Sequence, residues 1–211
     1  MIELTQNQKL FLKSVKPYLE EDNIQAVIES ARSTFVNTED ISTICAFLSE
    51  LGLPMFEGLS EVPILMFYDS PLTSIEIPSN IKVIRRNAFE ECRQLTSVTF
   101  NEGLEYIGLE AFKGCSSLTS IVLPDSLADE DDGTTIHGIN MNAFEGCKSL
   151  KSITLTSYIG ISPFAFSGCN AYLYVPESLY YRNGSSDRTD MALYYENELH
   201  GIKEVIPMAG K

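Results

Sequence analysis

The sequence predicts an α/β repeat solenoid, which is a stack of similar coils, preceded by a small N-terminal helical region. The word AFxxC occurs four times between Leu72 and Ala171. It aligns phenylalanines in one column, at Phe89, Phe112, Phe144 and Phe166. It aligns cysteines in a second column, at Cys92, Cys115, Cys147 and Cys169, with intervals of 23, 32 and 22 residues. A period in the twenties is typical of solenoids, in which each coil buries its apolar face only against its neighbours.

Residues 1–58 are predicted to form an N-terminal helical cap. Thr5 and Gln8 make a capping box, in which each side chain satisfies a free amide at the start of a helix. Apolar residues at helical spacing follow in three stretches, around Phe11, Ile28 and Cys45. Short amphipathic helices need a surface to pack against, and the open first coil offers one. A helix pair that binds a partner is the alternative interpretation.

Residues 59–179 are predicted to form the solenoid, each coil having a short strand, a return leg and a tight turn. In LTSIEIP the alternation points the isoleucines inward and Ser74 and Glu76 outward, as a strand requires. Stacking predicts two inner rows: Ile75, Val98, Ile121 and Ile153, and Ile84, Ile107, Ile139 and Ile161. A degenerate first coil begins at Val62, where MFYDSP replaces AFEECR and Ser70 takes the cysteine position.

The phrase LxxIxIPxxIxxIxxxAFxxCxxL resembles the BspA-like (treponemal-type) leucine-rich repeats over about residues 60–180. The phrase LYVPESL, at Leu173–Leu179, is similar to the closing phrase of that family, where a final strand precedes an irregular cap. The resemblance implies leucine-rich-repeat coils in a right-handed, slightly curved solenoid with a parallel β-sheet on one face. It also implies a role in protein binding and adhesion, and family members are often secreted or surface-bound.

Residues 180–211 are expected to form a C-terminal cap. YYRNGSSDR is loop-like, MALYYENEL can form a final helix, and IKEVIP can form a final strand or an extended tail. Tyrosines gather at this end of the chain, at Tyr172, Tyr174, Tyr180, Tyr181, Tyr194 and Tyr195. We expect most of them to cover the last coil. An interface is the alternative, because Tyr supplies a large contact area at low entropy cost.

One coil carries nine extra residues between Leu127 and Ile139, compared with the coil before it. The inserted stretch, ADEDDGTTIHG, is polar and rich in turn residues, which predicts a protruding loop. Insertions in solenoids often lie on the binding face. This acidic insertion loop, with Asp129, Asp131 and Asp132, is therefore a candidate contact for a protein partner. Loose Ca²⁺ binding is a further interpretation, although the ligand spacing of an EF-hand is missing.

The chain is acidic, with 29 Asp and Glu against 15 Lys and Arg and a formal net charge of −14. Nucleic acid and anionic membranes both require clustered cations, so neither is an expected partner. The first residues are polar and lack the apolar core of a signal peptide. No stretch reaches the roughly 20 apolar residues that a membrane span needs. We therefore expect a cytoplasmic location.

No catalytic or metal-binding constellation stands out in the sequence. Paired CxxC motifs are missing, and side chains in one repeat column run parallel, which disfavours both zinc sites and disulfides. The cysteines are therefore interpreted as buried free thiols. His137 and His200 belong to no HExxH, nucleophile-elbow or phosphate-loop pattern. We predict a protein without enzymatic activity, metal or cofactor.

The outward positions of the repeated strands form the best candidate surface. Small hydroxyls dominate this row, with Glu at one end and Tyr at the other. A flat row suits a protein partner better than a small ligand, which prefers a concave pocket. A sheet face that is merely wetted is the other interpretation. The predicted partner-binding residues are Glu76, Thr99, Val122, Thr154 and Tyr174 on the strands and Asp129, Asp131 and Asp132 in the acidic insertion loop.

The sequence thus favours a non-enzymatic scaffold for protein–protein interaction that presents the repeat surface and the acidic insertion loop to a protein partner. One alternative is an acidic inhibitor that mimics nucleic acid on a basic protein, which would show strong salt dependence and competition with DNA. Another is an exported adhesin or assembly component, which cell fractionation would identify. The identity of the partner and the oligomeric state do not follow from these patterns.

Overall fold

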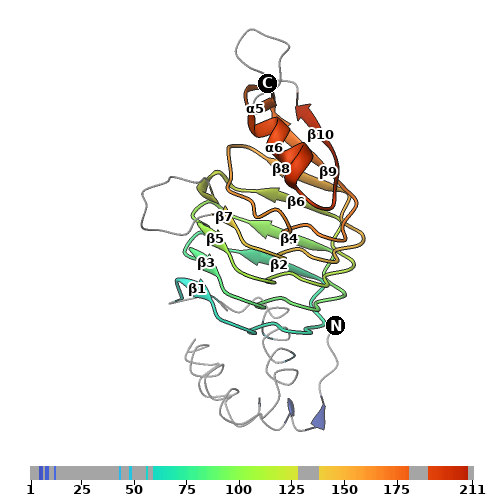
Figure 1. Cartoon of the computed structure of the whole chain (residues 1–211). Coiled ribbons are helices and arrows are strands. Elements are labelled where there is room, and N and C mark those ends of the chain that lie inside the picture. The colour runs from blue at the N-terminus through green and yellow to red at the C-terminus, as the bar shows by residue number, and fades with distance from the viewer. Residues whose placement is uncertain are drawn as a thin grey trace.

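The computed structural model describes residues 59–127, 138–180 and 190–208, together with single residues near the N-terminus. The strands form two parallel sheets, and both sheets run along the stack of coils (Figure 1). The long sheet has the order β10-β9-β8-β6-β4-β2. Its strands are β2 (Ser74–Ile77), β4 (Ser97–Phe100), β6 (Ser120–Leu123), β8 (Ser152–Leu155), β9 (Ala171–Pro176) and β10 (Ile202–Met208). The short sheet, on the return legs, consists of β1 (Glu61–Val62), β3 (Val83–Ile84), β5 (Tyr106–Ile107) and β7 (Gly138–Ile139).

The register of the strands confirms both predicted inner rows. In the long sheet Ile75 pairs with Val98, and Ile121 pairs with Ile153. In the short sheet Ile84 pairs with Ile107, and a single bridge joins Ile139 to Ile161. All eight side chains are buried. Because equivalent positions of successive coils are paired, the side chains at these positions point to the same side of the sheet in each strand.

The AF turns add a third line of backbone hydrogen bonds along the stack. The amide of each column phenylalanine donates to the carbonyl of the alanine before the next one, as in Phe89 to Ala111 and Phe112 to Ala143, both 2.7 Å. The rings are stacked with centroids 4.8 Å apart for Phe89 and Phe112. That spacing matches the roughly 4.8 Å between neighbouring strands, so rings and backbone share one repeat. Phe67 stacks on Phe89 at 4.9 Å, which confirms the degenerate first coil.

The column thiols act as hydrogen-bond donors inside the stack. Each Sγ donates to the carbonyl of the phenylalanine one coil earlier: Cys92 to Phe67 at 2.9 Å, Cys115 to Phe89 at 3.2 Å, Cys147 to Phe112 at 3.3 Å and Cys169 to Phe144 at 3.2 Å. Burial raises the pKa of the Cys115 thiol, so it stays protonated and able to donate. The interpretation as buried thiols is correct for three of these cysteines, whereas Cys169 in the last coil is partly exposed.

Left-handed backbone conformations frame each AF turn. The residue two places before the phenylalanine has a positive φ in four coils, at Leu65, Asn87, Glu110 and Asn142. The residue two places after it has a positive φ in five coils, at Asp69, Glu91, Gly114, Gly146 and Gly168. Side chains with a Cβ are strained in this region, by roughly 1–2 kcal/mol per residue. At the position two places after the phenylalanine, the first two coils therefore carry strain that the three coils with glycine there avoid.

At the N-terminal end, a few single residues are described. The Thr5 amide donates to the Gln8 side chain at 2.8 Å and the Gln8 amide donates to Thr5 Oγ1 at 3.3 Å, which confirms the predicted capping box. Leu48 and Phe56 are buried members of the solenoid core. The Asn80 side chain donates to the Phe56 carbonyl at 2.8 Å. The helices predicted elsewhere in residues 1–58 lie outside the described residues.

At the C-terminal end, two tyrosines take the place of a further coil. The chain forms α5 (Glu177–Tyr180), α6 (Asp190–Glu198) and β10, so the predicted final helix and strand are confirmed. The Tyr195 hydroxyl donates to the Ile159 carbonyl at 2.9 Å, and the Tyr194 hydroxyl donates to the Ile161 carbonyl at 3.0 Å. These carbonyls lie on the return leg of the last coil, where a next coil would supply amides. β10 then pairs in parallel with β9 and extends the long sheet.

The acidic insertion loop lies outside the described residues. The described chain before it ends with a 3-10 turn, Asp125–Leu127, and the described chain after it begins with β7. Among the helices that the structure describes, none is long and apolar enough to cross a membrane.

Removing one ring from the phenylalanine column should destabilise the whole stack. Phe112→Ala takes away a fully buried ring that stacks on both neighbours, at 4.8 and 5.1 Å. We expect a loss of about 3–5 kcal/mol in the free energy of unfolding, through lost contacts and a cavity. Urea denaturation measures it. Val122→Ala, at an exposed position, is the control and should change stability by less than about 0.5 kcal/mol.

The left-handed positions after the column phenylalanines allow a stabilising substitution. Glu91→Gly should raise the free energy of unfolding by about 0.5–1 kcal/mol, because glycine adopts its φ of 61° without strain. Gly146→Ala is the reverse change and should cost about 1 kcal/mol, since no atom lies closer than 4.0 Å to the added Cβ and only the backbone is affected. Thermal denaturation compares the two; a destabilised Glu91→Gly variant would contradict the argument.

Candidate functional site

The outward-pointing residues of the long sheet form one continuous surface, which we call the outer face. The ten positions predicted from the repeats all point outward in the structure: Ser74, Glu76, Ser97, Thr99, Ser120, Val122, Ser152, Thr154, Tyr172 and Tyr174. The register of β10 adds Glu204 beside Tyr172 and Ile206 beside Tyr174. The sequence did not predict these two positions, because a helix lies between β9 and β10 in the chain and the sequence does not show which strand β10 pairs with.

The outer face is uncharged from β4 to β9. Its outward positions there are hydroxyls, Val122 and two tyrosines, and the charged residues Glu76 and Glu204 lie on the strands at either end. Val122 is 58% exposed. The centres of protein interfaces are poor in charge and rich in aromatic residues, with charges at the rim. The composition of the outer face follows this pattern.

The two ends of the outer face differ, with a groove at one end and a lysine–tyrosine contact at the other. At the β2 end, a shallow groove runs over the outer side of β2 and β4 and is lined by Leu72, Thr73, Ser74, Ile75, Glu76, Ser97 and Thr99. At the β10 end, the Lys203 ammonium lies 4.6 Å from the centroid of the Tyr172 ring. It also donates to the Tyr172 hydroxyl, which raises the pKa of Lys203. Tyr172 is therefore held in place by a cation at the rim.

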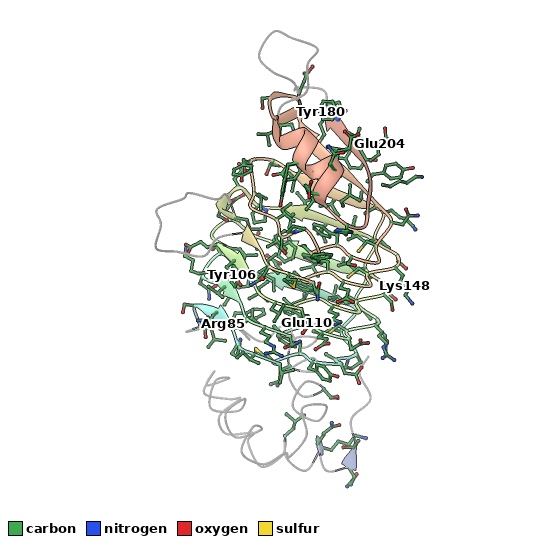
Figure 2. The ribbon with its side chains drawn as sticks, in the orientation of Figure 1. Arg85, Tyr106, Glu110, Lys148, Tyr180 and Glu204 are labelled. Atoms are coloured by element: carbon green, nitrogen blue, oxygen red, sulfur yellow. The ribbon has the colours of Figure 1, made fainter. Side chains whose placement is uncertain are left out.

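Both edges of the outer face carry charged residues. Where the long strands begin, the flanking residues include the cations Arg93, Lys148 and Lys151, and Arg93 forms an ion pair of 2.8 Å with the carboxylate of Glu91. Figure 2 shows Lys148 on this edge, on the opposite side of the molecule from Tyr106. Where the long strands end, the exposed flanking residues include the carboxylates Glu102 and Asp125. The Glu102 carboxylate accepts hydrogen bonds from the backbone amides of Asp125 and Ser126, at 3.3 and 3.2 Å, which fixes its position.

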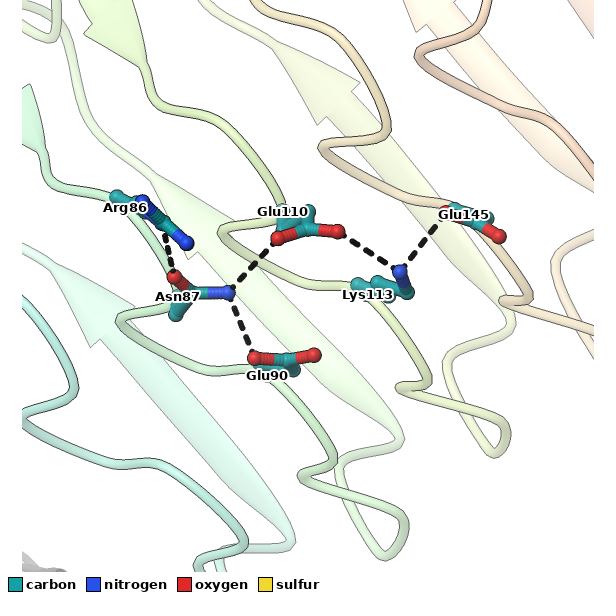
Figure 3. Close-up of polar contacts among 6 residues, drawn as sticks. All are labelled: Arg86, Asn87, Glu90, Glu110, Lys113 and Glu145. Atoms are coloured by element: carbon teal, nitrogen blue, oxygen red, sulfur yellow. Dashed lines mark hydrogen bonds and ion pairs between the residues drawn. The ribbon is translucent and has the colours of Figure 1, made fainter.

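A second polar feature, the turn network, connects successive coils through the AF turns (Figure 3). Asn87 lies at its centre, and its side-chain amide donates to the carboxylates of Glu90 at 2.6 Å and Glu110 at 3.2 Å. Arg86 Nε donates to the Asn87 side-chain oxygen at 2.7 Å. One amide therefore holds two carboxylates that come from neighbouring coils.

Lys113 continues the turn network to the next coil. Its ammonium lies 2.8 Å from Glu110 and 3.2 Å from Glu145. Hydrogen bonding to these two carboxylates, first of all Glu110, raises the pKa of Lys113. The sequence carries a signal of this contact: Glu90, Lys113 and Glu145 each follow a column phenylalanine, so their charges alternate along one column. Opposite charges in one stacked column attract across neighbouring strands.

The two carboxylates bound to Asn87 respond differently to their surroundings. Hydrogen bonding to Lys113 lowers the pKa of Glu110, with Asn87 adding to the effect. Burial raises the pKa of Glu90, and the nearby Glu110 charge adds to the increase. Ionised Glu110 therefore stabilises the fold at neutral pH, whereas ionised Glu90 opposes it.

The described parts of the outer face and the turn network do not group the ligands of a metal site. Within the residues that the structure describes, no three His, Cys, Asp or Glu side chains are grouped to hold a metal ion. The run Asp129, Asp131 and Asp132 lies outside that part of the chain. The outer face and the turn network are thus surfaces with hydroxyl, phenol and ion-paired groups, which suit contact with another molecule.

The repeated coil decides the family. The profile of the BspA type leucine rich repeat region matches residues 60–134 and 131–186 in six copies, which is well over half of the chain. The chain belongs to the BspA-type leucine-rich repeat family. This confirms the resemblance found in the AFxxC coils, and the α/β repeat fold agrees with it. A comparison with curated proteins found no match.

Three solved structures are similar to this chain. A leucine-rich repeat protein from Bacteroides capillosus has 23% identity and a TM-score of 0.39, covering 47% of this chain and 64% of its own. A leucine rich cell surface protein from Faecalibacterium prausnitzii has 20% identity and a TM-score of 0.40, covering 66% and 36%. A leucine-rich repeat protein from Bacteroides ovatus has 19% identity and a TM-score of 0.40, covering 72% and 46%. The chain spans less than two thirds of each of them.

The turn network predicts opposite effects for two similar substitutions. Glu110→Gln should lower the free energy of unfolding at pH 7 by about 0.5–1 kcal/mol, because it removes a carboxylate that Lys113 stabilises. The pKa of Glu110 is lowered from 4.5, so this stabilisation is present above that value and is lost as the pH falls through the folded-state pKa. The stabilities of the two proteins should therefore converge as the pH falls below 4.5 and through the lowered folded-state pKa of Glu110.

Glu90→Gln is the matched comparison for Glu110→Gln. The pKa of Glu90 is raised by burial, so ionised Glu90 destabilises the fold at pH 7, and Gln keeps an acceptor for the Asn87 amide. We expect Glu90→Gln to leave stability unchanged or to increase it. Urea denaturation at pH 7 and at a series of pH values below 4.5 measures the stability of both variants. Equal losses for the two variants at pH 7 would show that the carboxylates are not distinguished by their surroundings.

Proposed function

We propose that this protein is a non-enzymatic scaffold for protein–protein interaction and that the centre of its binding surface is the outer face. The observation that carries the proposal is the absence of charge from β4 to β9 on a surface whose ends and edges are charged. Nothing inside the coils requires it, because outward positions of a sheet are free to carry charge. Burial under a partner does require it, since an unpaired buried charge is costly.

The acidic insertion loop is the second part of the proposal. Asp129, Asp131 and Asp132 follow directly after the strand-end edge of β6, where Asp125 is already exposed. We include these carboxylates in the proposal as rim contacts of a partner that binds the outer face. Rim charges act mainly on the rate of association and on its salt dependence. The uncharged outer face favours this scaffold over an acidic mimic of nucleic acid, whose binding surface would need clustered carboxylates.

A cytoplasmic location is also part of the proposal. It is supported by the thiols of the described coils, which donate to backbone carbonyls and suit a reducing compartment. Cell fractionation tests it, and recovery of the protein at the cell surface would favour the adhesin role instead.

A charged substitution at the centre of the outer face should abolish partner capture. Val122→Arg places an unpaired cation in the interface, and we expect the recovered partner to fall at least about tenfold. Ile64→Arg is the matched control, because both positions are 58% exposed and Ile64 lies outside the long sheet. Quantitative mass spectrometry after affinity capture from the native cell measures recovery.

Further variants test the two parts of the proposed surface, the outer face and the acidic insertion loop, separately. Thr99→Arg and Thr154→Arg should act like Val122→Arg, whereas charge reversal at Asp129, Asp131 and Asp132 should weaken capture mainly at low salt. A partner whose recovery falls equally with Ile64→Arg, or with none of the variants, would place its binding site elsewhere.

A further inference from the structure

The two ends of the long sheet differ in how their last strand is protected. At one end, β10 has a lysine and a proline, Lys203 and Pro207, and a register shift near its start. All three features discourage the addition of another strand. At the other end, the sequence SIEI of β2 contains no lysine or proline, and β2 pairs with β4 in unbroken register. Within the described residues, β4 is the one neighbour of β2 in the long sheet, so β2 has an open edge.

The backbone groups on the open edge can be assigned from the bonds between β2 and β4. The Asn101 amide donates to the Ile77 carbonyl at 3.1 Å, so the backbone of Ile77 faces β4. Backbone groups of successive residues in a strand point to alternate edges, so Ile75 also faces β4, and Ser74 and Glu76 face the open edge. The N–H and C=O groups of Ser74 and Glu76 have no hydrogen-bond partner among the described residues. They are the groups to which a further strand would bond.

The groove at the β2 end follows this open edge. Its volume is about 340 Å³, and it is lined by the consecutive residues 72–76 together with Ser97 and Thr99. Leu72 and Ile75 are only 2% and 7% exposed, so mainly their backbone atoms can line a surface groove. The groove therefore exposes the edge of the strand as well as the outward side chains.

The open edge is recessed, because the first coil continues beyond β2 along two other lines. β1 pairs with β3, and the Phe67 amide donates to the Ala88 carbonyl at 2.8 Å, so the return leg and the AF turn both extend one coil further (Figure 1). Among the described residues, no strand of the long sheet does so. This step is about 4.8 Å deep, which is the spacing of one strand. It matches a single extended segment, whereas the projecting first coils of two copies would keep their β2 edges apart.

Glu76 provides a contact that distinguishes between bound segments. The Asn101 side-chain amide donates to Glu76 Oε1 at 2.9 Å, which holds the carboxylate in place. The second carboxylate oxygen bonds to no described residue. An added strand places one of its side chains beside Glu76. Opposite charges at such neighbouring positions stabilise strand pairing and like charges oppose it, so a basic side chain is favoured there.

We infer that the open edge of β2 binds an extended segment of a protein partner, which adds one strand to the long sheet and places a basic side chain beside Glu76. Main-chain hydrogen bonds to Ser74 and Glu76 supply the affinity, and the contact with the Glu76 carboxylate supplies the specificity. The inference rests on the proposed function as an interaction scaffold and names how a partner is held at the β2 end of the outer face.

A synthetic peptide tests the strand addition. Its sequence, LTSIKI, repeats residues 72–77 with the substitution Glu76→Lys, because the coils already stack on copies of this strand. Nuclear magnetic resonance follows its binding to the full chain up to about 5 mM peptide, a range that includes weak association. We expect saturable binding, with the largest shift changes at Ser74 and Glu76. No binding, or changes confined to other parts of the chain, overturns the inference.

A proline variant tests the backbone bonds. Ser74→Pro removes an amide that faces the open edge and leaves the bonds to β4 intact, as proline on an edge strand allows. The affinity for LTSIKI should fall at least about tenfold, whereas the matched control Ser74→Ala should bind like the parent. Equal binding to the two variants overturns the inference. If thermal denaturation shows that Ser74→Pro does not fold, Glu76→Pro with the control Glu76→Ala replaces this pair.

A charge exchange tests the contact with Glu76. The unchanged peptide LTSIEI places a glutamate beside Glu76, and we expect it to bind about threefold more weakly than LTSIKI. The protein variant Glu76→Lys should reverse this preference. The same preference in the parent and in Glu76→Lys would contradict the assigned position of the bound segment.

Hydrogen exchange of the free protein tests whether the edge is open. The amides of Ser74 and Glu76 should exchange at least about tenfold faster than those of Ile75 and Ile77, which face β4. Protection of all four amides in a monomer would show that another part of the chain occupies the edge. Protection that grows with protein concentration would show that a second copy occupies it. Either result overturns the inference.

Capture of the native partner separates this inference from the proposed function. A partner that is lost with Val122→Arg and retained with Ser74→Pro contradicts only the strand addition. A partner that is insensitive to Val122→Arg contradicts the outer face as the binding surface, whereas binding of LTSIKI to β2 would still support the open edge.

Discussion

The register between successive coils is the constraint on which the rest of the structure depends. Three lines of backbone hydrogen bonds and one column of stacked phenylalanine rings repeat at nearly the same spacing, with ring centroids 4.8 to 5.3 Å apart. Each thiol then reaches the carbonyl one coil earlier. A change in one coil is therefore felt by both neighbours. This coupling allows little variation inside the stack and leaves the outward positions to carry function.

The surface features follow from the same parallel stacking. Equivalent positions of successive coils lie in rows. A residue type that recurs at one position of each coil therefore forms a continuous row along the molecule. The uncharged outer face and the alternating column of Glu90, Lys113 and Glu145 both arise in this way. The turn network stabilises neighbouring coils against each other, whereas the outer face contributes little to the core. Its lack of charge therefore points to contact with another molecule.

The C-terminal cap shows how the stack ends without exposing its core. Tyr194 and Tyr195 donate to the carbonyls of the last return leg, and β10 continues the long sheet for one more strand. The contact is close: a Cβ at Gly201, whose φ is +89°, would lie 1.8 Å from the Phe166 carbonyl oxygen. The cap is thus fitted to this coil, and it also extends the candidate binding surface by Glu204 and Ile206.

The sequence by itself determined the repeat, the inner rows, the outward positions and the family. Each of these depends on the regular spacing of residue types along the chain, which can be read from the sequence. Only the tertiary structure decided which strand β10 joins, that the thiols are donors, and that Asn87 holds carboxylates from two coils. Apart from the bond between Asn87 and Glu90, which are three positions apart, those contacts join residues separated by more than 20 positions or by a helix, and they depend on side-chain geometry. A spacing pattern predicts that such residues are neighbours, but it does not show which atoms meet.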